Sequence, residues 1–407
     1  MEVVSPYVCG LDVHKKSITA CILTPTGKEI RTFGTMTDDL LELVDWIRSF
    51  HCTHVAMEST GVYWKPIYNL LELESNLMVL VVNAKHMKQV PGRKTDVKDA
   101  EWIAELLKHG LLSPSYIPNR EQRELRELVR YRRSLIEERA REANRIQKVL
   151  EGANIKLGSV ATNVLGTSGR LMMKEIIKGE DDPVKLACLA KQQLKKKHDE
   201  LARSLKGLIG HHQKMMIETQ LRHIEYLEEE IRLLDEEIKQ RMVSFEKEIE
   251  RIDTIPGIGR RTAEQIIAEI GTDMSRFPSA NHLASWAGMV PGQNESAGKR
   301  RSTHTRKGNR YLRSALVESA ASCVRVKDGY LTAKYKRLAF RRGTKRARMA
   351  IAHQLLVIIY YLLTRKEDYK ELGSQYFEKD KQEQKKKQAV RALEKLGFQV
   401  TIEPQPA

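Results

Sequence analysis

Four acidic residues in the first hundred positions have the types and spacing of a metal site. Asp12 interrupts the apolar run GLDV, and Glu58 ends the apolar run HVAME. Asp96 and Asp99 are one helical turn apart at the start of an expected amphipathic helix, so they share one side of it. Mg²⁺ prefers such oxygen ligands, and two ions can hold the attacking and leaving oxygens of a phosphodiester. Singly, each acid also fits a strand end or, with Thr95, a helix cap.

The acids lie in a basic setting. The 407-residue chain has a formal net charge of +17, which indicates a polyanionic partner. Nucleic acid is the first candidate, because lysine and arginine neutralise phosphates and release counterions. We therefore predict that cations next to the acids hold a phosphate backbone. These cations are Lys15, Lys16, Arg93, Lys94 and Lys98.

A second basic segment surrounds a serine. Between Ser296 and Val317 there are seven lysine or arginine residues and no acid. Cations of this kind can stabilise a serine alkoxide and the charge that develops at an attacked phosphate. No His-Asp partner is evident, His304 is nearby, and a solvated loop serine is the ordinary interpretation. The seven basic residues, which we predict contact nucleic acid, are Lys299, Arg300, Arg301, Arg306, Lys307, Arg310 and Arg313.

The sequence IPGIG at 255–259 precedes this segment and resembles a helix-hairpin-helix turn. Gly257 and Gly259 would allow backbone N–H groups to approach a phosphate without a side chain between them. A plain turn between two helices is the alternative interpretation.

The surrounding pattern predicts an α/β domain over residues 1–118. Apolar runs at 7–13, 17–23 and 29–35 predict three strands, and further strands are expected at 53–59 and 77–83. Helices are expected at 37–50, near 63–74, and after Asp96. This order resembles the ribonuclease H layout.

The rest of the chain predicts mainly helices. Residues 119–250 form an expected helical connector, which glycines and an Asp-Asp-Pro sequence break near 152–183 before a second long helix. In that helix, residues at coiled-coil spacing predict a buried stripe: Ile224, Leu227, Ile231, Leu234 and Ile238. That stripe fits an antiparallel pairing within the chain or, the interpretation we favour, a contact with a second chain. Residues 251–368 predict a helical domain, and residues 369–407 a polar tail. The role of residues 150–215 is not predicted.

Composition excludes other classes. The five cysteines form no CxxC pair, which argues against a disulfide framework and a cysteine zinc site. We find neither an apolar run of about 18 residues nor a signal-peptide layout, so we expect no membrane partner.

The two motif blocks, GLDVHK…MESTG…RKTDVKDAEWIAELL and TIPGIGRRTA…WAGMVPGQNESAGKRRSTHTRKGNRYLR, resemble the DEDD transposases of the 110 family of bacterial insertion sequences. The resemblance implies a RuvC-like N-terminal domain, a coiled-coil connector and a C-terminal transposase domain. It implies that Asp12, Glu58, Asp96 and Asp99 bind Mg²⁺, and that Ser296 attacks DNA to form a 5′-phosphoserine.

The same resemblance implies partners. These are double-stranded DNA at the element ends and the target, a structured non-coding guide RNA from the element, and further copies of the chain in a dimer or tetramer. The expected location is the bacterial cytoplasm, at the nucleoid. Two other interpretations stay open: a RuvC-like junction endonuclease that cuts with metal-activated water, and a non-catalytic nucleic-acid-binding protein.

Overall fold

The protein divides into two compact units, residues 1–118 and 119–407. Most of the predicted polar tail lies outside the residues that the structure describes. The computed structural model describes residues 3–59, 61–83, 96–292, 295–296, 299–300, 305, 307–376, 390, 393–394 and 397, with the side chains of 96–97 and 295–300 excepted.

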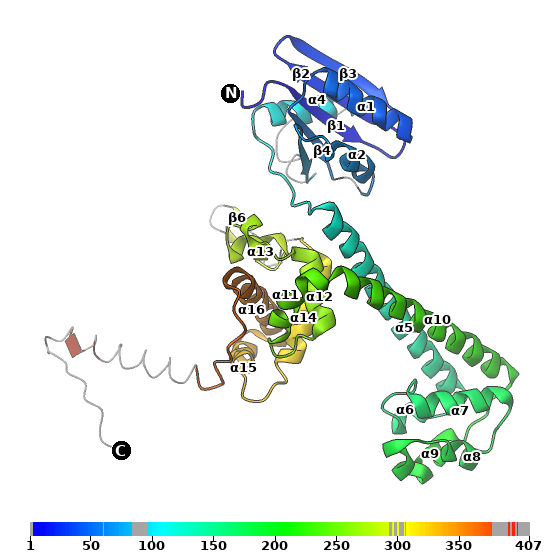
Figure 1. The fold of residues 1–407 in the computed structure, drawn as a ribbon. Helices are drawn as coiled ribbons and strands as arrows, with labels where there is room; N and C mark the ends of the chain where they lie inside the picture. The colour runs from blue at the N-terminus through cyan, green and yellow to red at the C-terminus, as the bar shows by residue number, and fades with distance from the viewer. Residues whose placement is uncertain are drawn as a thin grey trace. The chain divides into compact units, whose positions relative to one another are not determined.

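A five-stranded mixed sheet, in the order β3-β2-β1-β4-β5, forms the centre of the first unit (Figure 1). β1 pairs antiparallel with β2, and β2 with β3, whereas β1, β4 and β5 are parallel neighbours. The five predicted strands are confirmed, and so is the α/β plus α class; the ribonuclease H and RuvC-like assignment stays a prediction. The strands are β1 (Val8–Val13), β2 (Ile18–Thr24), β3 (Gly27–Phe33), β4 (His54–Glu58) and β5 (Met78–Val82).

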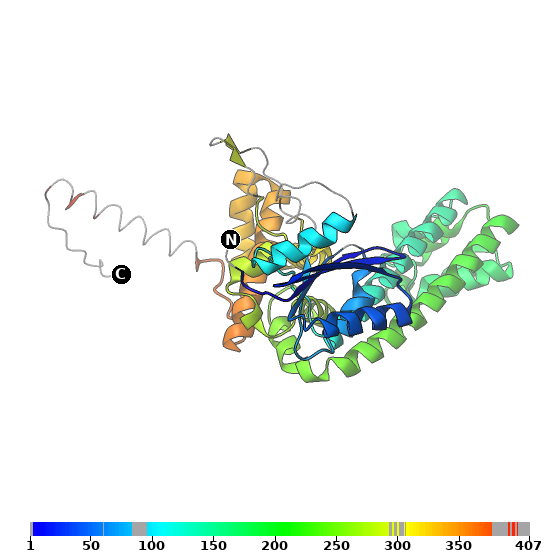
Figure 2. The same ribbon diagram turned by 90° about the horizontal axis from the view of Figure 1, so that it is seen from above.

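Helices cover both faces of this sheet, as Figure 2 shows for α1 and α4. On one face, α1 (Thr37–Ser49) and α2 (Trp64–Leu71) share an apolar cluster with alternate residues of β1 and β4. On the other face, α4 (Asp96–Lys108) packs against the intervening residues of the same strands. Each fully buried leucine or isoleucine in these clusters contributes about 1.5–3 kcal/mol, so the sheet is fixed between two layers.

Two long helices, α5 (Arg120–Gly152) and α10 (His211–Arg241), pair antiparallel in the second unit. Arg241 forms an ion pair with Glu124 at one end of the pair, and Arg139 forms one with Glu228 further along.

The predicted coiled-coil stripe of α10 packs against this partner helix. Leu227 and Ile231 form a buried cluster with Leu135 of α5. The stripe is therefore covered by the same chain, which corrects our preference for a contact with a second chain. Heptad spacing shows that a helix face is buried, but the identity of the covering helix is not a local property.

A helical subdomain, residues 153–210, connects α5 to α10; we refer to it as the tip subdomain. Its core includes Leu157, Met172, Leu186 and Leu201. These short helices lie where the sequence predicts a break in the helical connector, and they share their core with the adjoining ends of α5 and α10. Its elements are α6 (Leu157–Val160), α7 (Thr167–Lys178), α8 (Pro183–Cys188), the 3₁₀ helix η1 (Gln192–Lys197) and α9 (His198–Leu205).

The C-terminal part of the second unit is mainly helical around one apolar helix, α16. Among the described residues, α16 alone is long and apolar enough to cross a membrane. Its residues Ile351, Leu355 and Ile359 are fully buried, as in the core helix of a globular domain. The helices are α11 (Glu246–Asp253), α12 (Arg260–Ile270), α13 (Ala280–Trp286), α14 (Arg310–Cys323), α15 (Tyr330–Arg342) and α16 (Thr344–Arg365).

Candidate functional site

Asp12 and Glu58 lie at the ends of two adjacent parallel strands. Leu11 of β1 pairs with Met57 of β4, so Asp12 and Glu58 are each one residue further along. Successive side chains of a strand point to opposite faces, and Leu11 and Met57 face the cluster shared with α1 and α2. Asp12 and Glu58 therefore project on the face that α4 covers.

The helix α4 crosses this face with its N-terminus toward the two strand ends. The Val4 amide donates to the Lys108 carbonyl oxygen at 2.9 Å, which places the last turn of α4 at the start of β1. Further along β1, a Cβ on Gly10 would lie 2.3 Å from the Ala100 carbonyl oxygen and 2.5 Å from the Ala104 amide nitrogen. Glycine permits this approach because it has no side chain. The first turn of α4 thus extends toward the end of β1.

The sheet-facing stripe of α4 runs through both of its aspartates. Ala100 and Ile103 are buried against the sheet, and Asp96 and Asp99 precede them by four residues, which is the same helix face. Asp99 is partly buried. The topology brings the two acidic strand ends and this first turn to one edge of the sheet. Among the described side chains, which exclude that of Asp96, no three His, Cys, Asp or Glu groups are close enough to hold one metal ion.

Sequence reasoning missed a histidine at this edge of the sheet. His14 Nε2 lies 3.0 Å from Asp12 Oδ2, with the Asp12 side chain 13% exposed and the histidine 49% exposed. The i, i+2 spacing along an extended chain was the available signal. Of the predicted phosphate contacts here, Lys15, Lys16 and Lys98 are exposed, whereas Arg93 and Lys94 lie outside the described residues.

In the second unit, Ser296 lies in a short β-hairpin. β6 (Glu295–Ser296) pairs antiparallel with β7 (Lys299–Arg300), with Ser296 opposite Lys299. The segment that carries this hairpin, which we call the Ser296 arm, begins and ends where Gly288 and Gly308 are in contact. A Cβ on Gly308 would lie 2.3 Å from the Gly288 amide nitrogen. The backbone thus places Ser296 opposite a basic residue in the hairpin. The side chains of the hairpin, and all of Arg301, His304 and Arg306, lie outside the described residues.

A buried carboxylate contacts Asn309, the residue that follows Gly308. Glu269 of α12 has a side chain that is 1% exposed, and Arg130 of α5 donates to both of its oxygens at 2.7 Å. Asn309 donates from Nδ2 to Glu269 Oε2 at 2.6 Å. The Asn309 side chain also accepts from the Tyr311 and Leu312 amides and so caps α14. Sequence reasoning missed this set; the acid within the apolar run IIAEI was the available signal.

The predicted IPGIG hairpin joins α11 to α12. Gly257 has a φ of 88°, and a Cβ there would lie 2.5 Å from the Cys323 amide nitrogen, so this glycine is required for packing against α14. Gly259, just before α12, has open space at its Cβ position. Of the other predicted phosphate contacts, Lys307 and Arg310 are exposed and Arg313 is partly buried.

Two family models match the two parts of the chain that contain the candidate residues. Residues 9–155 match the family model of DEDD transposases of the IS110 type, described as a transposase. Residues 249–336 match a second model, described as a transposase of the IS116/IS110/IS902 family. The first match contains the four acids, and the second contains Ser296 and Gly257.

Curated relatives extend along most of the chain. The transposase for insertion sequence element IS1111A of Coxiella burnetii is 25% identical over 89% of this chain and 91% of its own length. A probable family 20 transposase of Pseudomonas aeruginosa is 26% identical, over 80% and 88% respectively. The pilin gene-inverting protein of Moraxella lacunata is 24% identical, over 87% and 94%. The chain therefore belongs to the IS110 family of transposases, enzymes of DNA transposition and recombination.

Proposed function

We propose that this transposase excises and inserts its own element by attack of Ser296 on DNA, at a site where Asp12, Glu58, Asp96 and Asp99 hold Mg²⁺. The convergence of two acidic strand ends with the first turn of α4 supports the metal assignment. All four groups are carboxylates, the donors that suit a small, hard cation. When bound, Mg²⁺ would polarise the scissile phosphate and offset its charge.

The serine step exchanges one phosphodiester for another. The Ser296 hydroxyl loses its proton, its oxygen bonds to phosphorus, and the bond from phosphorus to the 3′ oxygen breaks. The products are a 5′-phosphoserine and a 3′-hydroxyl, which takes up a proton. Lys299 and Arg300 stabilise the negative charge that develops on the phosphate. A 3′-hydroxyl of a partner strand then attacks the phosphoserine and restores the serine, so no ATP is needed.

We further propose that a structured RNA from the element selects the DNA, and that the protein acts as a dimer or tetramer. The net charge of +17 supports more than one nucleic-acid partner. The pilin gene-inverting relative supports a reaction that rejoins DNA strands after cutting them.

A covalent adduct between protein and DNA tests the serine mechanism. The purified protein is incubated with labelled element-end DNA, Mg²⁺ and RNA transcribed from the element flanks, then resolved on a denaturing gel. We expect an adduct with the wild type, and none with Ser296→Ala, Asp12→Asn or Asp99→Asn. Matched controls are Ser302→Ala in the same basic segment and Glu101→Gln on α4, the helix of Asp99; the Glu101 carboxylate pairs with Lys28 of β3. Both control variants should form adducts.

Other outcomes would replace the proposal. Cleavage without an adduct that survives Ser296→Ala but not Asp99→Asn would establish a hydrolytic RuvC-like nuclease. DNA binding without Mg²⁺-dependent cleavage, unchanged in the acid variants, would establish a binding protein. Omitting the RNA tests guidance separately, since an adduct of the same yield and position without RNA would contradict it.

A further inference from the structure

The tip subdomain, residues 153–210, has no role in the proposed chemistry. It lies almost wholly between the two family matches, which cover residues 9–155 and 249–336. Its fully buried residues, among them Leu157, Met172 and Leu201, pack in one core with the adjoining ends of α5 and α10, which contribute Leu150 and Ile217. A packed subdomain of this kind can carry a binding surface that the two matched segments do not supply.

A pocket of about 720 Å³ opens in this subdomain between the loop before α7 and the segment that forms η1. The Lys191 amide donates to Ser168 Oγ at 2.9 Å, which holds these two walls together. The eleven described residues that line the pocket include hydroxyls, amides and two lysines but no acid. The polar groups used below are Thr162, Asn163, Thr167, Ser168, Lys191 and Lys195.

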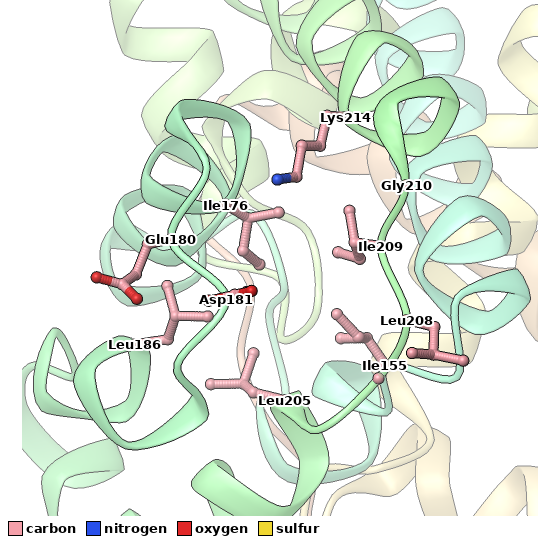
Figure 3. Close-up of a pocket in the computed structure, with 11 residues that line it drawn as sticks. Ile155, Ile176, Glu180, Asp181, Leu186, Leu205, Leu208, Ile209, Gly210 and Lys214 are labelled. Carbon is pink, nitrogen blue, oxygen red and sulfur yellow. The ribbon is translucent and has the colours of Figure 1, made fainter.

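A second pocket of the same subdomain has the opposite character. Its volume is about 340 Å³, and its apolar side chains include Ile176, Leu186 and Leu205 (Figure 3). Glu180, Asp181 and Lys214 also line it, so its charged groups are two acids and one base, and this net negative lining is unfavourable for phosphate. The positive sign of the larger pocket is therefore a local property and not a consequence of the overall charge of the protein.

The lysines of the larger pocket differ from other lysines of the subdomain in their ion pairing. Lys178 pairs with Glu175 at 2.7 Å, and Lys185 pairs with Glu180 at 3.6 Å. In the described part of the chain, no carboxylate lies within 4.0 Å of the ammonium of Lys191 or Lys195, which are both exposed. Lys196 and Lys197 extend the same exposed run. These positive charges are available to an external anion.

The composition of the subdomain favours a duplex over unpaired bases. Residues 153–210 contain no Phe, Tyr or Trp. Proteins that hold single strands stack bases on aromatic side chains, whereas contacts to the backbone of a duplex need cations, hydroxyls and amides. The pocket presents the second set of groups.

We propose that this pocket binds phosphates of duplex DNA, with Lys191 and Lys195 as the cationic contacts and Thr162, Asn163, Thr167 and Ser168 as polar neighbours. The contact adds DNA-binding energy outside the catalytic domains. It requires neither the serine step nor the metal, so its test is separate from that of the proposed mechanism.

The test compares two double variants of the full chain that lose the same charge. Lys191→Gln/Lys195→Gln removes the pocket cations, and Lys178→Gln/Lys185→Gln removes two lysines that are each 69% exposed but already paired. Fluorescence anisotropy measures binding of a labelled element-end duplex, the same sequence as a single strand, and the same duplex as RNA, over a series of salt concentrations. Thermal unfolding checks that both variants are folded.

We expect the pocket variant to bind the DNA duplex about tenfold more weakly near physiological salt. The slope of log affinity against log salt should fall by about 1–2, since each lost phosphate contact contributes about 0.9. The matched variant should bind like the wild type. Equal affinities and slopes for the two variants would overturn the proposal. A loss confined to RNA or to the single strand would also overturn it, and would assign the pocket to that ligand.

Discussion

Replacing Glu269 by glutamine should destabilise the second unit more than any exposed charge change. The glutamine keeps the shape and one acceptor, but it removes the negative charge that faces Arg130, Arg126 and Asn309. The side-chain amide N–H groups of the glutamine would face the N–H donors of these same three residues. The Arg126 side chain, 12% exposed, would keep its bonds to the backbone carbonyls of Ala268 and Glu269.

The magnitude follows from this geometry. Breaking a buried ion pair by removing one partner costs about 3–5 kcal/mol. The lower end applies here, because Arg130 is 34% exposed and water can replace part of its lost contact. We therefore expect a loss of about 3 kcal/mol. For a unit of this size, about 2 °C per kcal/mol gives a fall in Tm of about 6 °C.

Differential scanning calorimetry of the full chain measures this change. The control is Glu236→Gln on α10, because Glu236 is 58% exposed and pairs with Arg232 on the same helix. Exposed pairs contribute about 0–1 kcal/mol, so the control should shift the Tm by less than about 2 °C. If Glu269→Gln unfolds at the same temperature as the control rather than well below it, the buried network does not stabilise the second unit.

Two further predictions concern the first unit and the thiols. Gly10→Ala should displace α4, because its Cβ would lie within 2.5 Å of two backbone atoms of that helix. We expect this variant to form no adduct and to lose about 1–3 kcal/mol of folding free energy. The control Gly152→Ala, with open space at its Cβ position, should be neutral in both assays. Burial raises the pKa of Cys21 from 9.0 to about 11 and the pKa of Cys52 and Cys323 to about 12. Above pH 9 the unfolded chain therefore binds fewer protons than the folded chain. The free energy of unfolding should then fall as the pH rises toward 11. A Cys52→Ala/Cys323→Ala variant should show a weaker fall in urea titrations at successive pH values, and an equal fall would contradict the assignment.

The first unit could be predicted closely from sequence because its signals are local. Apolar runs such as ITACILT are bounded by turn residues, and an acid at the end of such a run is visible without any partner. The placement of α4 could not be predicted in the same way. It depends on Gly10, whose contacts with Ala100 and Ala104 join residues about ninety positions apart.

The sequence predicts a break in the helical connector near 152–183, but neither the helices of the tip subdomain nor the buried network could be predicted, for a related reason. α6 has four residues and α8 has six, too few to show helical periodicity or to be stable alone. They depend on a shared core that includes Leu157 and Leu186. Likewise, Glu269 and Arg130 are separated by 139 residues, so local sequence gives a charged residue on each helix without showing that the two charges meet.

The location of the net positive charge follows only after these pairs are known. α5 is rich in arginine and on composition alone is a candidate surface for nucleic acid. In the structure Arg130, Arg132 and Arg139 form ion pairs with carboxylates of α12 and α10. Most of the positive charge of this helix is therefore neutralised within the protein. Lys191 and Lys195 in the tip pocket have no such partner among the described residues. Because free cations rather than total cations release counterions from DNA, the short lysine run of the tip is a stronger predictor of a DNA contact than the long arginine-rich helix.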